Sequence, residues 1–173
     1  MNKYSTITII AIVAMVLPIV YGFWNMYSVE QLQLRTPNNK FSYFDMSNSE
    51  KIKICNPTPF FVSFNGIEID VYYQDDVKGT FKVDSATLDP NTFKILDVNF
   101  TSESFSESQY MFMHMDGEFS GSIDIRLDPN KMLVNTIYQT NIIGIIPYEQ
   151  TITQSAFDFS TTMNENSSCD DID

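Results

Sequence analysis

The chain has 173 residues, a formal charge of −12, and 43% hydrophobic against 18% charged residues. An acidic chain of this kind repels phosphate backbones, and no cluster of Lys and Arg offsets the repulsion, which argues against a nucleic-acid partner. Without an apolar N-terminal segment and a polar C-terminal tail, roughly 130 residues remain, about the size of one domain. We therefore predict an anchor over residues 1–28, a domain over residues 29–159 and a disordered acidic tail over residues 160–173.

The N-terminal segment from Ile7 to Tyr27 contains no charged side chain. Its length of about 20 residues suits a helix that spans a bilayer. Aromatic rings prefer the membrane interface, and four of them crowd the C-terminal end of the segment: Tyr21, Phe23, Trp24 and Tyr27. We predict a single-pass anchor that contacts the lipid bilayer through residues 7–27. Lys3 and the α-amino group on the short N-terminal side place the rest of the chain on the extracytoplasmic side of the cell membrane.

A cleaved signal peptide is the alternative for the same segment. Lys3 would form its charged start, residues 7–17 its apolar stretch, Pro18 its helix breaker and Val20-Tyr21-Gly22 its cleavage site. The bulky Tyr21 beside the cleaved bond, and the apolar residues that continue beyond it, favour the retained anchor.

The rest of the chain alternates apolar and polar residues in short runs. The clearest run is Ile67–Tyr73, which follows the rigid turn Asn56–Phe60, and its period of two predicts a strand with one face in solvent. Within residues 92–101 the alternation changes phase between Ile95 and Leu96, which predicts a bulge or a strand switch that turns all the apolar residues inward. Further strands are predicted over residues 31–34, 51–55, 79–84, 121–127, 132–146 and 148–159, with Pro147 at an edge or a strand start.

One short helix interrupts these strands. Ser104 and Glu107 have the spacing of a capping box ahead of the run 110–113, and Gly117 is a stop signal. Residues 41–45 form a further short segment, followed by the polar turn 47–49 and then by the strand predicted over residues 51–55. Seven to eight short strands, turns rich in Pro, Gly and Asn, and one small helix indicate an all-β fold, an antiparallel β-sandwich preceded by a transmembrane helix.

Three short motifs carry a family resemblance. The strand and Asn-Pro turn of Lys51–Phe60 resemble the opening of the late-embryogenesis-abundant type-14 domain, also called the water-stress and hypersensitive-response domain. The segments 121–125 and 145–148 are similar to the ending of that domain. The resemblance covers about residues 29–159 and implies a fibronectin-III/immunoglobulin-like β-sandwich, often carried on one transmembrane helix in archaeal and plant members. It carries over no catalytic residues, and it marks as motif positions Asn56, Pro57, Pro59 and Phe60.

One cluster contains the soft ligands that suit Cu(I), and it consists of Met111, Met113, His114 and Met115. The alternative is a helix whose methionines fill gaps in the core. On a helix Met111 and Met115 share a face and Met113 lies opposite, so the set does not converge on one ion. We expect core packing with His114 more exposed, and therefore no metal site and no cofactor.

The two cysteines, Cys55 and Cys169, could form a disulfide in an oxidising compartment. We favour a buried Cys55 and a free Cys169, because a bridge would have to order a polar tail at an entropic cost. Glycosylation sequons start at Asn99 and Asn166.

No residue pattern specifies a reaction. His114 is the sole histidine, and no Gly-x-Ser-x-Gly or similar nucleophile turn accompanies it, so we predict that the protein is not an enzyme. We predict a membrane-tethered binding or scaffold module that contacts other membrane or envelope proteins, such as an accessory subunit of a membrane complex. The alternative is a lipid- or hydrophobic-ligand-binding or stress-protective domain, suggested by the family and by the supply of 14 Phe and 9 Tyr. A Phe- and Tyr-lined cavity between sheets would favour the alternative, and a closed core with an apolar patch near the membrane would favour the scaffold.

Overall fold

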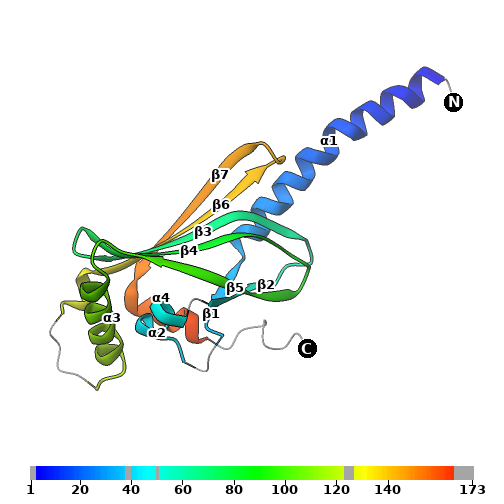
Figure 1. The fold of residues 1–173 in the computed structure, drawn as a ribbon. Helices are drawn as coiled ribbons and strands as arrows, with labels where there is room; N and C mark the ends of the chain where they lie inside the picture. The colour runs from blue at the N-terminus through cyan, green and yellow to red at the C-terminus, as the bar shows by residue number, and fades with distance from the viewer. Residues whose placement is uncertain (1–2, 38–39, 50, 123–126, 166–173) are drawn as a thin grey trace.

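Strands dominate the chain after an N-terminal helix, as the period-two pattern predicts. The computed structural model describes residues 3–37, 40–49, 51–122 and 127–165. Figure 1 shows the arrangement of the elements. The helices are α1 (Lys3–Glu30), α2 (Tyr43–Ser49), α3 (Phe105–Phe119) and α4 (Ala156–Asn164), with a 3₁₀ turn at Pro129–Lys131. The strands are β1 (Gln33–Arg35), β2 (Lys51–Asn56), β3 (Val62–Tyr73), β4 (Asp76–Leu88), β5 (Thr92–Thr101), β6 (Met132–Ile142) and β7 (Ile146–Ser155).

The strands form one curled antiparallel sheet in the order β1-β2-β5-β4-β3-β6-β7 (Figure 1). The predicted central strand is confirmed as β3, which pairs with β4 on one side and β6 on the other. Its residues Ile67, Ile69 and Val71 are buried, as their alternation predicts. Pro147 lies in the second position of the edge strand β7, which confirms its predicted place.

β5 changes its partner part-way along its length. Residues 92–97 pair with β2, whereas residues 98–101 pair with β4. This confirms the predicted strand switch, two residues later than expected. Phe93 and Ile95 are exposed, so the prediction that all apolar residues of this strand point inward is wrong. The ring of Phe93 is instead covered by the Lys53 ammonium group, 4.3 Å from its centroid.

The partner change gives the sheet two limbs that share β5. The limb β1-β2-β5 and the limb β5-β4-β3-β6-β7 are joined in one hydrogen-bonded order. The fold is therefore mostly β with a few helices, and the more specific fibronectin-III-like sandwich stays a prediction.

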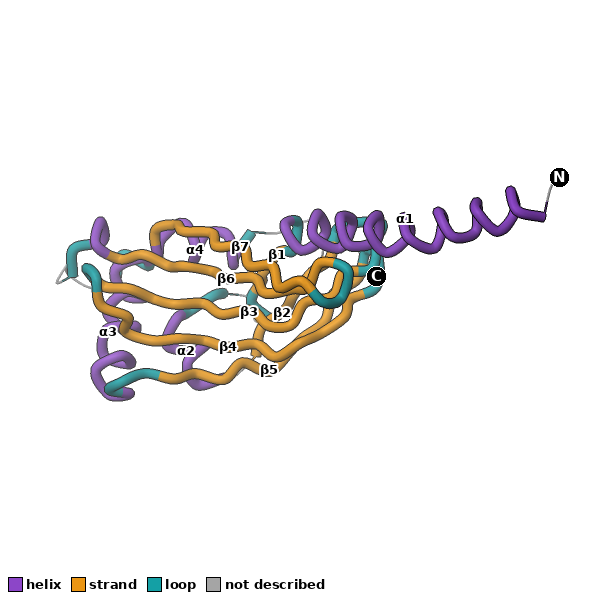
Figure 2. The backbone as a smooth tube through the Cα atoms, turned by 90° about the horizontal axis from the view of Figure 1, so that it is seen from above, coloured by secondary structure: helices purple, strands orange, loops and turns teal. Residues whose placement is uncertain are grey.

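α1 has two halves with different surroundings. Figure 2 shows its first half projecting beyond the sheet and its second half alongside the strands. Side chains from Ile7 to Ile19 are exposed on every side, whereas Gly22, Asn25 and Val29 are buried at helical spacing. The span Thr6–Glu30 has a mean hydropathy of 2.4 and is long and apolar enough to cross a membrane. The folded unit thus begins inside α1, before the boundary that the sequence suggests at residue 28.

Three short helices complete the core. They contribute buried side chains that pack with those of the strands: Tyr43, Met46, Met111, Phe112, Met115, Phe159 and Met163. α3 starts after Ser104 as predicted, but the Ser104 side chain makes no capping hydrogen bond. Residues 41–45, which precede the predicted second strand, lead into α2, which begins at Tyr43.

The polar tail predicted to be disordered from residue 160 begins as a helix. In α4 the Ser155 hydroxyl accepts a hydrogen bond from Asp158 N–H, which caps the first turn. Ala156, Phe159 and Met163 form its buried face. Met163 is the one member of this face within the predicted tail, so the tail sequence gives little indication of a helix. Residues 166–173 lie outside the described residues, as do residues 123–126 of the predicted strand and of the family motif at 121–125.

Asp70 differs from the expected solvent-facing position on β3. Its side chain lies in a residue only 8% exposed and accepts a 2.6 Å hydrogen bond from the Thr80 hydroxyl of β4. The alternation places it on the opposite face from Ile69, where it is buried beside its cross-strand partner Thr80. The second face of β3 is therefore drier than its sequence suggests.

We expect Ile69→Ala to lower the free energy of unfolding by about 2–5 kcal/mol, because it empties a fully buried site. Asp70→Ala should cost about 1–3 kcal/mol, because it leaves the Thr80 hydroxyl without its acceptor. The exposed Asp84→Ala is the control and should cost under about 0.5 kcal/mol. Urea unfolding followed by circular dichroism measures all three, and a loss for Asp84→Ala equal to that for Ile69→Ala would contradict the assignment of faces.

Candidate functional site

A hydrogen-bonded junction fixes α1 to the sheet. The amide of Asn25, in a residue only 4% exposed, accepts from Ser63 N–H at 2.7 Å and donates to the Ser63 carbonyl at 3.0 Å. It also donates to the Thr140 hydroxyl at 2.9 Å, which itself donates to the Ser63 carbonyl at 2.7 Å. The ladder between β3 and β6 begins only at Gly66, so the Asn25 amide takes the place of a strand partner beside Ser63. α1, β3 and β6 are joined by satisfied buried polar groups.

The Asn-Pro turn packs beside this junction. Asn56 is fully buried, and its amide donates to the carbonyls of Phe60 at 2.7 Å and Asp89 at 2.9 Å. Its carbonyl oxygen accepts from Thr58 N–H at 3.1 Å, and the Thr58 hydroxyl lies 3.1 Å from that of Ser28 in α1. Pro57 is half-buried and Pro59 is exposed. Of the four family-motif positions, Asn56 therefore organises the turn.

The fourth motif residue, Phe60, lies against one of the predicted membrane-interface residues, Trp24. Its ring stacks on that of Trp24, with centroids 5.0 Å apart and an interplanar angle of 11°. Tyr21, Phe23 and Tyr27 are exposed on other sides of α1. The structure thus brings together Trp24 and Phe60, which the sequence analysis assigned to separate motifs.

The hairpin between β6 and β7 lies on the other side of α1. A Cβ atom on Gly22 would come within 2.9 Å of the Ile143 nitrogen and 3.2 Å of the Ile142 side chain. Only a glycine therefore permits this close approach of helix and hairpin. At the tip Ile145 N–H donates to the Ile142 carbonyl at 3.3 Å, and Ile143 has a φ of 58°.

The sequence analysis missed Asn25, Gly22 and the hairpin tip as parts of one site. A signal existed for Asn25, since it is the one side-chain amide in the uncharged run 7–27. An amide in an apolar segment is costly to bury without partners, so it predicts a polar contact at that level of the helix. The partners themselves come from residues 38 and 115 positions away in the chain.

α3 separates the Met and His candidates. Met111 and Met115 are buried in the core and Met113 is exposed, which confirms the helical geometry. The His114 ring lies edge-on to Tyr110, with centroids 4.2 Å apart, and both of its nitrogens are shielded from solvent without a hydrogen-bond partner. His114 is half-buried and is therefore more exposed than Met111, Phe112 and Met115, as expected. Among the described residues no group of three or more His, Cys, Asp or Glu side chains could hold a metal ion.

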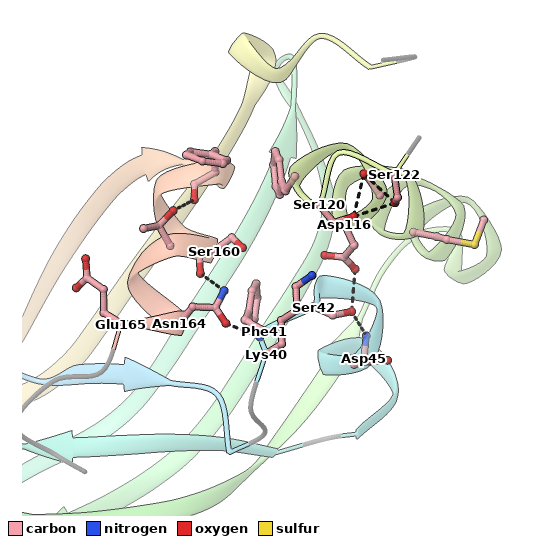
Figure 3. Close-up of a pocket in the computed structure, with 15 residues that line it drawn as sticks. Lys40, Phe41, Ser42, Asp45, Asp116, Ser120, Ser122, Ser160, Asn164 and Glu165 are labelled. Atoms are coloured by element: carbon pink, nitrogen blue, oxygen red, sulfur yellow. Dashed lines mark hydrogen bonds between the residues drawn. The ribbon is translucent and has the colours of Figure 1, made fainter. Parts of the chain in front are cut away.

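A groove of about 720 Å³ lies between α2, α3 and α4 (Figure 3). Its walls combine aromatic, polar and charged side chains: Lys40, Phe41, Ser42, Asp45, Met113, Asp116, Phe119, Ser120, Ser122, Phe157, Ser160, Thr161, Asn164 and Glu165. The sequence does not predict this groove, because its walls come from three segments that are far apart in the chain: 40–45, 113–122 and 157–165.

Asp116 ties two walls of the groove together. Its carboxylate accepts from the Ser42 hydroxyl at 2.8 Å (Figure 3). It also accepts from the backbone N–H groups of Tyr43 and Phe44 at 2.9 Å each. Burial raises the pKa of Asp116 above its ordinary value, and the three hydrogen bonds oppose that rise without cancelling it. Burial, with the nearby Asp116 charge, also raises the pKa of the Tyr43 phenol, which donates to the Ala156 carbonyl at 2.7 Å. The contacts join α2, α3 and α4 and have a structural role.

The remaining sequence candidates have separate outcomes. Cys55 is fully buried, as expected, but it takes part in a disulfide, so the expectation that no bridge forms there is wrong. Cys169 lies outside the described residues. Asn99 is exposed on β5, where a glycan would be accessible, and Asn166 again lies outside the described residues.

Comparison with models of known protein families finds no matching family. Comparison with curated proteins finds no similar sequence. The likeness to the late-embryogenesis-abundant type-14 domain therefore rests on the short motifs quoted above.

We expect Asn25→Leu to lower the free energy of unfolding by about 1–3 kcal/mol, because it leaves Ser63 N–H buried without an acceptor. Unfolding of the detergent-solubilised chain by urea measures the loss. Asn99→Ala removes an amide from an exposed position on β5 and should change stability by less than about 0.5 kcal/mol. Equal stability of the Asn25 variant and wild type would show that the junction does not hold the domain together.

Proposed function

We propose that the protein is a membrane-tethered, non-enzymatic binding or scaffold module with its β domain on the extracytoplasmic side. In this proposal α1 anchors the chain as a single membrane pass, and the domain resembles the late-embryogenesis-abundant type-14 β-sandwich. Its partners would be other membrane or envelope proteins, as for an accessory subunit of a membrane complex.

The observation that carries the proposal is the continuity of α1. One helix runs from the exposed apolar half through Pro18 to Glu30, and its second half is bonded to β3 and β6 through Asn25. Tyr148 of β7 also donates to the Glu30 carboxylate at 3.1 Å. A segment built into the domain in this way supports a retained anchor over a cleaved leader, whose cleavage site would interrupt the helix at Gly22.

The filled core supports a scaffold over a ligand carrier. Large side chains from both limbs of the sheet and from the helices are fully buried, among them Tyr43, Phe64, Phe81 and Phe112. Phe81 packs on Phe112 with ring centroids 5.8 Å apart. These aromatic residues fill the space in which a carrier of lipids would hold its ligand. The abundance of Phe and Tyr suggested a hydrophobic ligand, but these buried aromatic residues pack the core of the domain itself.

The groove between α2, α3 and α4 is the surface we assign to a partner. Phe157 is 54% exposed in its wall and packs on Phe119 with centroids 5.5 Å apart. Aromatic residues that are exposed in a hollow and surrounded by polar groups are typical of interface anchors. The volume of about 720 Å³ is also in the range of small-ligand sites, which keeps a hydrophobic ligand as the second candidate.

We expect the full chain to stay in the membrane pellet after carbonate washing, and a variant that lacks residues 1–19 to be released in folded form. Side chains 7–19 are exposed on every side, so their removal leaves the packed half of α1 intact. Immunoblotting of pellet and supernatant measures the distribution, and protease added to intact cells tests the extracytoplasmic side. A mature chain that begins near Phe23 would contradict the anchor.

We expect a stoichiometric membrane protein to copurify with the gently solubilised chain, and Phe157→Glu to reduce its recovery about tenfold or more. Phe105→Glu is the matched control, because Phe105 is also 54% exposed but lies outside the groove, against Phe100. Mass spectrometry of the captured material measures the recovery. A bound lipid that is lost in the Phe157 variant would favour the ligand-binding alternative.

A further inference from the structure

The free part of α1 is too short to cross a bilayer by itself. The uncharged stretch that follows Lys3 runs for sixteen residues from Tyr4 to Ile19, after which one side of the helix packs on the domain. At a rise of 1.5 Å per residue they span about 24 Å, whereas the hydrocarbon core of a bilayer is about 30 Å thick. Any tilt shortens the crossing further. About 20 residues, counted from Tyr4 to Phe23, are needed, and these end inside the packed half.

The far boundary of the hydrocarbon core therefore falls at the level of two loops that flank α1. Gly22 lies against Ile142 and Ile143 of the β6–β7 hairpin, and Trp24 stacks on Phe60 of the Asn-Pro turn. Figure 1 shows the hairpin and the turn beside α1 where it leaves the sheet. A bilayer that covers α1 up to Phe23 has to meet both loops.

Both loops lack charge although the chain as a whole is strongly acidic. Residues 4–29, 54–67 and 132–148 contain no Asp, Glu, Lys or Arg, and the second and third of these segments include the Asn-Pro turn and the hairpin tip that lie beside α1. Charged groups border these segments, with Glu30 in α1 and the exposed Asp89 in the β4–β5 turn, whose backbone carbonyl accepts from Asn56. This distribution is what an apolar medium requires, because a charge placed in hydrocarbon is expensive.

The hairpin tip exposes apolar side chains that packing does not require. Ile145 is 81% exposed, the largest value among the large hydrophobic residues of the described chain, and Ile146 and Phe61 are also exposed. Ile143 adopts a φ of 58°, a left-handed conformation that costs a β-branched residue about 1–2 kcal/mol and that Asn or Gly would adopt more easily. The tip is therefore apolar at a turn where Asn or Gly would make the folded protein more stable in water.

We infer that the β6–β7 hairpin tip and the Asn-Pro turn form a second membrane contact, in which Ile145, Ile146 and Phe61 insert into the lipid beside α1. This inference rests on the proposed membrane tether. The occupant of the surface is the interfacial layer of the leaflet from which α1 emerges. Trp24 and Phe60 lie at the centre of the contact, and the Asp89 turn limits its depth. In this arrangement the domain contacts the bilayer through three segments, namely α1, the β6–β7 hairpin tip and the Asn-Pro turn, and not through α1 alone.

The test uses full-length protein in phosphatidylcholine vesicles that carry lipids brominated near the headgroup end of the acyl chains. Bromine quenches tryptophan fluorescence only on contact, and Trp24 is the sole tryptophan of the chain. The variant Trp24→Phe with Ile145→Trp reports from the hairpin tip. The variant Trp24→Phe with Tyr110→Trp is the control, because Tyr110 is exposed on α3 at the far end of the sheet. Both substituted side chains are exposed, and far-UV circular dichroism verifies folding.

We expect the Ile145→Trp variant to be quenched to about the same extent as wild-type Trp24, and the Tyr110→Trp variant to keep its full fluorescence. Quenching of Trp24 without quenching at position 145 would overturn the second contact and leave the tether intact. Failure of the wild-type chain to float with the vesicles, with Trp24 unquenched, would overturn the tether and the second contact together. Equal quenching at positions 145 and 110 would indicate nonspecific adsorption and would also overturn the inference.

Discussion

The contact between the Asn25 amide and both backbone groups of Ser63 is the constraint on which the architecture depends. Without it, β3 would begin with an unpaired N–H beside an apolar helix, at a point that the β6 ladder does not reach. Because a buried amide is stable only with its partners in place, the contact fixes both the height and the rotation of α1 against the sheet. Gly22, Ser28 and Val29 follow in register along the same side of the helix. The apolar helix is therefore an element of the domain and not an appendage joined by a linker.

Much of the sheet could be predicted because its signal is local. Alternation in Ile67–Tyr73 identifies β3, Pro147 identifies an edge, and the change of phase near Ile95 identifies the partner switch of β5. The side to which the apolar side chains of β5 point could not be predicted from the change of phase. Phe93 faces outward in the part of β5 that pairs with β2 and not with β4. α2 and α4 escaped prediction for a related reason. Their buried positions, such as Met163, have meaning only against a core that other segments create.

The candidate site was predicted in its parts and missed as a whole. The aromatic group near Trp24 and the motif at Asn56 are visible as short patterns, yet nothing in either pattern shows that Trp24 stacks on Phe60. The polar partners of Asn25 lie far away in sequence, so their identity depends on the fold. His114 is a comparable case. Its ring contacts Tyr110 because the two residues are four apart on one helix, a spacing that the methionines between them made easy to overlook. Local patterns thus identify residues of interest, and long-range packing assigns their neighbours.

The length of β3 has a consequence for how the outer end of the molecule meets its surroundings. Its twelve residues rise about 3.3 Å each, so the end of the sheet that carries α3 stands about 40 Å from the Asn-Pro turn. In the proposed membrane tether, the junction between α1 and the sheet holds the α3 end at this distance from the bilayer, several times the Debye length of ~8 Å at physiological salt. In that proposed arrangement, a membrane protein can contact the groove between α2, α3 and α4 only if it extends about as far from the lipid.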